Sequence, residues 1–112
     1  MSCDLLIGED SWNSSCGNVA WVLEVASRHV ESPEVAKELR AFTSGYVVVE
    51  DFGRSFGAEA CEQIVEALRT KLLAAVRAEF DGVNRDYLVP HVEELIAMAE
   101  RWRGFAVEAG QA

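Results

Sequence analysis

The most regular pattern of hydrophobic positions lies in residues 57–80 and predicts a helix. Its apolar residues recur at steps of three and four, which places them on one face of a 3.6-residue helix. At roughly 1.5 Å per residue this helix is about 35 Å long, enough to cross a small domain. The rest of the chain is expected to pack around the face formed by Cys61, Ile64, Val65, Leu68, Leu72, Ala75 and Val76.

Two helices are predicted before this segment. Residues 16–30 carry a helical apolar face that extends sideways, which indicates burial on two sides. Because its valines also favour extended structure, a strand is the alternative for this segment. Residues 32–42 begin with a helix signal, because Ser32 can cap free backbone amides and Pro33 suits the first helical position.

A fourth helix is predicted at residues 90–103, again from apolar positions at helical spacing. Gly104 is the expected C-terminal cap, since glycine readily adopts the left-handed conformation found there. The segment before Pro90 is expected to form at most one helical turn that the proline interrupts. Residues 105–112 are then a frayed tail.

Short runs of apolar residues predict two strands, DLLI at residues 4–7 and YVVVE at residues 46–50. Residues 8–17 and 51–57 are rich in turn-forming residues and predict loops. The expected fold is mainly α (α+β), a single domain over 1–112. About four helices pack around the helix at 57–80, beside a small two-stranded sheet.

Length and composition indicate a globular domain that needs neither a disulfide nor a metal. Half of the 112 residues are hydrophobic, which suffices for a substantial core. The three cysteines are an odd number, which argues against a closed disulfide framework. The first residues lack the basic and apolar regions of a signal peptide, and no apolar run is long enough to span a membrane. We therefore expect a cytoplasmic protein without membrane association.

The charge is acidic and uneven. Asp plus Glu number 19 against 10 Lys plus Arg, a formal net charge of −9. Residues 1–66 hold 12 acids and 4 bases, whereas residues 67–112 hold 7 acids and 6 bases. Because such a surface repels phosphates, direct nucleic-acid binding is not expected, and a basic protein is the natural partner. The alternative is that the acidity serves only solubility.

Catalytic and metal-binding signatures are weak. Cys16 lies near the start of a predicted helix, whose dipole would lower the pKa of its thiol. His91 is the histidine that could serve as its base, since His29 lies about 20 Å away along the same helix. The cysteines and histidines are scattered singly, so no metal or other cofactor is expected. The DFG at residues 51–53 is interpreted as a turn, because the chain lacks the other parts of a kinase.

Two acidic pairs and two aromatic residues form the candidate binding site. Each acidic pair follows a predicted strand, so a parallel pairing of the strands would bring both pairs to one edge of the sheet. The carboxylates there could bind a cation, act as general acid or base, or hold Arg and Lys of a partner, while loop aromatics are typical of interfaces. The alternatives are solvated loops and aromatics that fold back on the core. The predicted partner-binding residues are Glu9, Asp10, Trp12, Glu50, Asp51 and Phe52.

These observations favour a protein-binding module rather than an enzyme. Its most concrete form is an immunity or antitoxin-type inhibitor that covers the active site of a basic toxin, such as a nuclease, with an anionic face. One alternative is a homodimeric assembly subunit with Trp21 and Trp102 in its interface. The other is a small thiol enzyme that uses Cys16.

Overall fold

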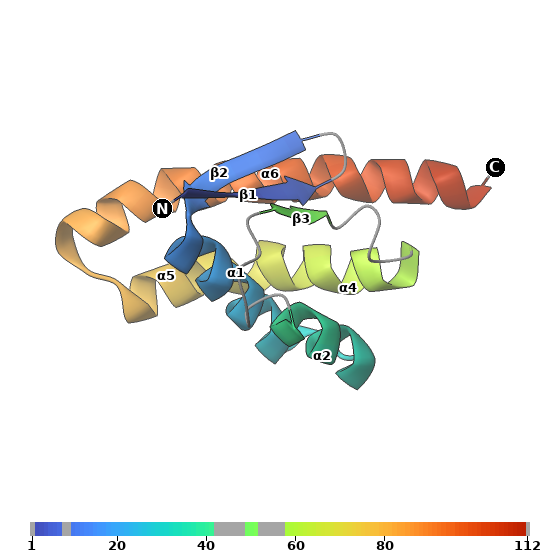
Figure 1. The fold of residues 1–112 in the computed structure, drawn as a ribbon, viewed down its shortest axis with the longest axis horizontal. Helices are drawn as coiled ribbons and strands as arrows, with labels where there is room; N and C mark the ends of the chain where they lie inside the picture. The colour runs from blue at the N-terminus through green and yellow to red at the C-terminus, as the bar shows by residue number, and fades with distance from the viewer. Residues whose placement is uncertain (1, 8–9, 42–48, 52–57, 112) are drawn as a thin grey trace.

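The computed structural model describes residues 2–7, 10–41, 49–51 and 58–111, with side chains described in 3–7, 10–40 and 59–102. The chain is mainly helical with a small sheet, as predicted (Figure 1). A long helix, α6, runs beside the sheet and the other helices. In chain order the elements are β1 (Ser2–Ile7), β2 (Asp10–Ser15), α1 (Cys16–His29), α2 (Pro33–Ala41), β3 (Val49–Asp51), α4 (Ala58–Ala67), the π-helical turn η1 (Leu68–Leu72), α5 (Leu73–Glu79) and α6 (Gly82–Gln111).

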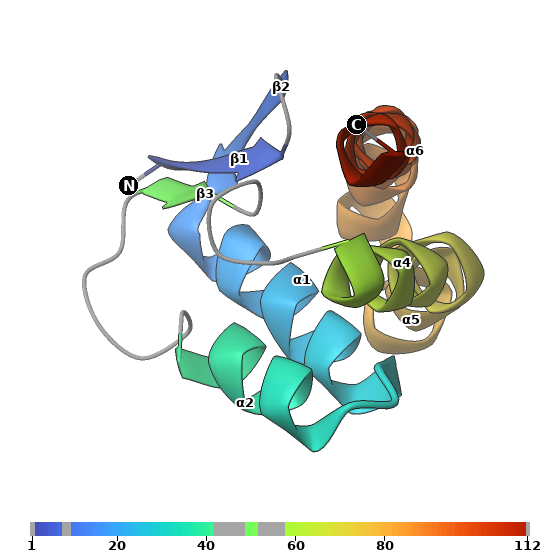
Figure 2. The ribbon, with the colours of Figure 1, turned by 90° about the vertical axis from the view of Figure 1, so that its right-hand side faces the viewer.

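The sheet has the order β2-β1-β3, so the N-terminal strand lies in its middle. β1 is parallel to β3, with Asp4 opposite Val49 and Leu6 opposite Asp51. The pairing of the two predicted strands is therefore found, although residues 46–48 of the second lie outside the described residues. Figure 2 shows the sheet above α1, with α6 at its side.

The prediction of a loop over residues 8–17 is wrong for residues 10–15, which form β2 antiparallel to β1. Burial alternates along this strand, with Trp12 and Ser14 buried and Ser11, Asn13 and Ser15 exposed. The serines and the asparagine led to the prediction of a loop. An edge strand can carry such polar residues, because it needs apolar residues only on the side that faces the core.

The helix predicted at 57–80 is confirmed as the continuous run of α4, η1 and α5. The five-residue π turn lies within it, and Leu68 and Leu72 at its two ends are both buried. The run ends at Phe80, whose N–H donates to the carbonyl of Val76 (2.9 Å). The predicted apolar face is in the core, fully buried at Cys61, Ile64, Val65, Leu68, Leu72 and Val76 and partly buried at Ala75.

The two early helices are also confirmed. For α1, helix is correct and the strand alternative is wrong, because the Ser15 hydroxyl accepts from the backbone N–H of Asn18 (3.1 Å) and starts the helix directly after β2. α2 begins at Pro33 as predicted, and the Ser32 hydroxyl accepts from the N–H of Val35 (3.4 Å). Capping chemistry is local in sequence, which explains why these starting points were predictable.

The C-terminal helix is longer than predicted at both ends. α6 begins at Gly82 and contains Pro90, and it continues past Gly104 to Gln111. Pro90 is exposed, so the carbonyl that loses its helical N–H partner there can turn to water. The buried face of α6 follows helical spacing on both sides of the proline and includes Leu88, Val92, Leu95, Ala99 and Trp102.

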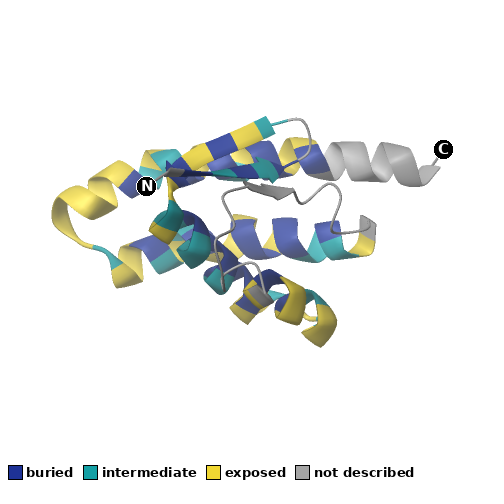
Figure 3. Cartoon of the chain, in the orientation of Figure 1, coloured by how far each residue is buried: buried dark blue, intermediate teal, exposed yellow. Residues whose placement is uncertain are grey.

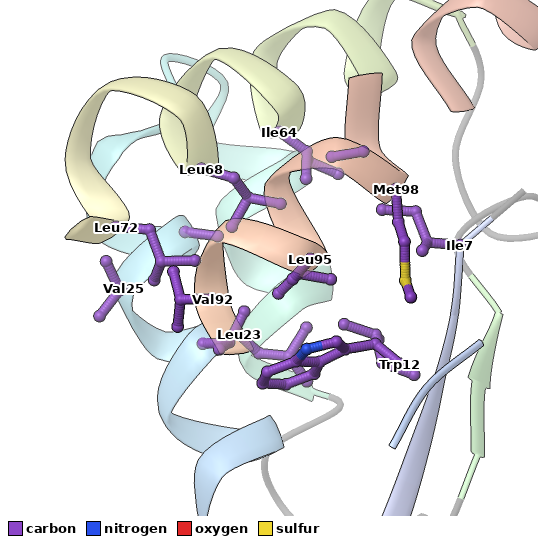
Figure 4. Packing of buried hydrophobic residues seen from close by; sticks show 14 of the residues in the cluster. Ile7, Trp12, Leu23, Val25, Ile64, Leu68, Leu72, Val92, Leu95 and Met98 are labelled. Carbon is purple, nitrogen blue, oxygen red and sulfur yellow. The ribbon is translucent and has the colours of Figure 1, made fainter. Parts of the chain in front are cut away.

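The core lies where the sheet, α1 and the later helices meet. Figure 3 shows buried residues on the facing sides of these elements, and Figure 4 shows their side chains converging on one cluster that includes Trp12, Leu23, Leu72 and Leu95. In the described part of the chain, no helix has both the length and the apolar content that crossing a bilayer requires.

The expectation that the chain has no disulfide is wrong. Cys3 of β1 and Cys16, the first residue of α1, form a disulfide bond. The register places Cys3 opposite Ser14, so the hairpin itself brings Cys16 within reach. Cys61, the third cysteine, is not disulfide-bonded and is buried, as its place on the helical face predicted.

Candidate functional site

The parallel pairing brings the two acidic segments to the same end of the sheet. Asp10 of β2 lies opposite Ile7, and Asp51 of β3 lies opposite Leu6 on the other side of β1. Two inter-strand spacings separate them, about 10 Å between backbones. Glu9 and Phe52 lie outside the described residues. Glu50 and Asp51 are placed by their backbone alone, in register with Leu5 and Leu6.

Asp10 is engaged in an ion pair within the fold. Its carboxylate accepts from Nε of Arg101 at 2.9 Å, which ties β2 to α6. This hydrogen bond lowers the pKa of Asp10 from its ordinary value of 3.8 and raises the pKa of Arg101. The pair lies at the surface, and Arg101 neutralises the negative charge of Asp10 that was predicted to bind a partner protein.

Trp12 is not an exposed loop aromatic, which corrects that prediction. Its side chain is 1% exposed. The indole Nε1 donates to the backbone carbonyl of His91 (2.9 Å), and the two rings stack with centroids 4.6 Å apart. The Nε2 of His91 in turn lies 3.0 Å from the carbonyl of Asn13. Trp12 and His91 therefore hold β2 on α6, and Trp12 is part of the core.

The candidates for thiol and metal chemistry are changed by the structure. Cys16 is bonded to Cys3 and so carries no thiol, while Cys61 is buried. His91 contacts Trp12 and Asn13 instead of a cysteine. Among the side chains that the structure describes, no three His, Cys, Asp or Glu gather closely enough to hold a metal ion.

A groove between the end of α1 and the central helices is a feature that the sequence analysis missed. It encloses about 380 Å³. Its residues come from two segments that are far apart in sequence, 29–31 and 62–71, so no local motif predicts it. One signal was available: Glu59, Glu62 and Glu66 recur at helical spacing on the face of α4 opposite its core residues. We call it the acidic groove, and it is lined by His29, Glu31, Glu62, Gln63, Glu66, Ala67, Thr70 and Lys71.

Two hydrogen bonds involve residues that line the acidic groove. The Oε1 of Gln63 accepts from the backbone N–H of Ser32 (2.9 Å), which fixes the α1–α2 link on α4. The Thr70 hydroxyl donates to the carbonyl of Glu66 (2.7 Å) as the π turn begins. Turns of π-helix inside α-helices occur frequently at functional sites, and Thr70 and Lys71 of this turn both line the groove.

The charge of the acidic groove is negative. Its lining has three glutamates and one lysine. Both carboxylate oxygens of Glu66 accept from Nη2 of Arg69 (2.7 and 2.8 Å), and Arg69 is shared with Glu100 (3.7 Å). Even so, the lining retains more carboxylates than cations. This arrangement can accept an ammonium or guanidinium group, which forms its strongest hydrogen bonds with carboxylates.

Comparisons with protein-family models, with curated proteins and with solved structures find no match to this chain.

Proposed function

We propose that this protein is a binding module, without enzymatic activity, that docks on a basic protein through the acidic groove. The observation that carries the proposal is that Glu31, Glu62 and Glu66 all line the acidic groove, which is already formed in the unbound protein. Its volume is near the lower end of ligand pockets, which span roughly 300–1,000 Å³. That size suits one or two Lys or Arg side chains of a partner.

The net charge of −9 also supports a basic protein as the partner. An acidic surface attracts a basic protein over a distance and repels nucleic acid and anionic lipid, so we propose neither as a partner. The sheet end with Asp10 and Asp51 is the weaker docking surface, because Asp10 is held by Arg101 and Trp12 is buried.

The most concrete form of this function is an immunity or antitoxin-type inhibitor. Such a protein covers the active site of a basic toxin, for instance a nuclease, by presenting carboxylates where the toxin binds phosphate. The acidic groove offers carboxylates on a rigid helical wall, which lowers the entropy cost of docking. The thiol-enzyme alternative lacks its nucleophile while Cys16 is bonded to Cys3.

The test compares two double variants with the same change in charge. Glu31→Lys with Glu62→Lys reverses two carboxylates of the acidic groove, and Glu38→Lys with Glu93→Lys reverses two exposed carboxylates elsewhere. The tagged proteins are used to capture partners from a lysate of the source organism at low and high salt. We expect a basic protein that elutes with salt and is lost only with the groove variant.

Other outcomes of this experiment count against the proposal. Equal loss with both double variants would mean that capture depends on net charge and not on the groove. Recovery of the protein alone, at a mass above the monomer by light scattering, would favour the homodimer alternative. In that case the acidity serves solubility.

A cytoplasmic location remains part of the proposal. The Cys3–Cys16 disulfide weighs against it, since such bonds persist mainly in oxidising compartments. Trapping thiols in intact source cells with an alkylating reagent before lysis decides the question. A cytoplasmic protein is expected to be recovered with Cys3 and Cys16 alkylated, and an exported one with both protected.

A further inference from the structure

The first half of α6 has a second apolar stripe on the side away from the core. Val83, Tyr87 and Pro90 follow the i, i+4, i+7 spacing of one helix face. All three are exposed, and Val83 (84%) and Tyr87 (59%) are the large hydrophobic residues most exposed among the described side chains. Figure 3 colours most residues at this end of the molecule, where α5 is followed by α6, as exposed.

Two arginines, Arg77 of α5 and Arg85 of α6, have no acidic partner. Arg85 lies on the other side of α6 from Val83 and Tyr87, because residues two positions apart on a helix do not share a face. The chain has nineteen acidic and ten basic residues, so most basic side chains are expected to pair with a carboxylate. Among the arginines with described side chains, Arg77 and Arg85 alone make no side-chain hydrogen bond, salt bridge or other electrostatic contact. The arginines that are engaged are Arg28, Arg40, Arg69 and Arg101.

The two free arginines face the same hollow. It encloses about 320 Å³ between α5 and α6 and is lined by Arg77, Arg85, Asp86, Val89 and Pro90. Its lining thus has two cations against one carboxylate. Pro90 belongs both to this hollow and to the apolar stripe, so the two features meet at Pro90.

We propose that the hollow and the stripe that meets it at Pro90, together called the α5–α6 corner, bind an acidic segment of a partner protein that carries both carboxylates and apolar side chains. Arginine's planar fork matches a carboxylate with two parallel hydrogen bonds. Apolar residues further along the segment, past Pro90, pack on Tyr87 and Val83, and exposed aromatic residues and arginines are typical of interface hot spots. The stripe favours a peptide over a nucleic-acid backbone, because phosphate contacts need no apolar surface.

This site is independent of the acidic groove. It involves other helices and a ligand of opposite charge, so loss of binding at one site leaves the other intact. The probe is the synthetic octapeptide EDLFEDLF, titrated into the full-length ¹⁵N-labelled protein and followed by amide chemical shifts. We expect the shifts to centre on Arg77, Val83, Arg85 and Tyr87 and to leave Glu62 and Glu66 unmoved.

Matched variants test the two halves of the proposal. Arg85→Glu removes one of the two guanidinium groups. It is expected to weaken the affinity for the peptide about tenfold or more, because hydrogen bonds between charged groups contribute that much affinity. Lys37→Glu, on exposed α2, makes the same change in net charge and is expected to weaken it less than about twofold. Tyr87→Ala is expected to weaken the peptide without altering its salt dependence.

The following results would overturn the proposal. One is the absence of corner shifts at millimolar peptide, and another is equal weakening by Arg85→Glu and Lys37→Glu. Binding of the basic peptide KKLFKKLF at the corner with similar affinity would show a purely apolar patch. Corner shifts that depend on protein concentration alone would indicate a second copy of the chain, and stronger shifts with a deoxythymidine octamer would indicate nucleic acid.

Discussion

The indole Nε1 of Trp12 donates a hydrogen bond to the backbone carbonyl of His91, 2.9 Å away, and their rings stack at 4.6 Å. The two residues are 79 positions apart in the chain. This contact joins an edge strand that looks like a polar loop to the longest helix. It explains why an aromatic residue expected at an interface is instead part of the core.

Two substitutions of Trp12 are expected to destabilise the fold to different extents. Trp12→Phe keeps most of the apolar contact but loses the hydrogen bond, which costs about 1–2 kcal/mol. Trp12→Ala also leaves a cavity and costs about 3–5 kcal/mol. Urea unfolding followed by circular dichroism measures both. Equal losses for the two variants would show that the hydrogen bond, and not packing, carries the contribution of Trp12.

The Asp10–Arg101 pair predicts a pH dependence of defined sign. Arg101 lowers the pKa of Asp10 below 3.8, so the folded state holds the carboxylate more strongly in its ionised form than the unfolded state does. Its contribution to stability is complete above about pH 3.8 and is lost as the pH falls through the lower folded value. An NMR titration of Asp10 is expected to move its midpoint upward, towards 3.8, in Arg101→Gln. An unchanged midpoint would contradict the pairing.

The disulfide predicts specific numbers of reactive thiols. Without reductant, the denatured protein is expected to take up one alkylating group, at Cys61, and after reduction three, as mass spectrometry would show. The bond closes a loop with a sequence separation of 13, so its removal in Cys3→Ser with Cys16→Ser is expected to cost about 3 kcal/mol. Three reactive thiols without reductant would mean that the bond does not form in solution.

Two glycines predict opposite responses to alanine. Gly82 has φ of +56°, where a side chain is strained, so Gly82→Ala is expected to destabilise the protein by about 1–2 kcal/mol. Gly17 lies in α1, where an added Cβ would meet only the Ser15 hydroxyl oxygen at 4.0 Å. Gly17→Ala is therefore expected to stabilise it by about 0.5–1 kcal/mol. Thermal unfolding of the two variants tests the signs, and a loss of stability at both positions would contradict this reasoning.

The helices were predictable because their signals are local. The apolar positions of 57–80 repeat every three or four residues. Ser15 and Ser32 each cap a helix that begins at the next residue. Each of these signals needs only the neighbouring sequence. Pro90 was misread for the opposite reason. Its local preference is to interrupt a helix, but the face that includes Leu88 and Val92 is buried on both sides of it.

The candidate site was predicted less well because it depends on distant pairs. The parallel pairing of β1 and β3 places Asp10 and Asp51 at one end of the sheet, as the sequence indicated. That Asp10 meets Arg101, however, depends on how α6 crosses the sheet. The acidic groove similarly joins residues of α1, α4 and η1, and only Glu62 and Glu66 on a single helix face hinted at it.

The amino-acid sequence by itself determined the mainly helical class, the central helix at 57–80 and the acidic charge, because hydrophobic period, capping and composition are properties of neighbouring residues. The tertiary structure decided which polar residues are buried or paired. It turned residues 10–15 into a strand through the contacts of Trp12 with α6, joined Cys3 to Cys16, and left Arg77 and Arg85 without acidic partners. The physical reason is that burial and pairing are decided by contacts between segments far apart in the chain, which no local pattern encodes.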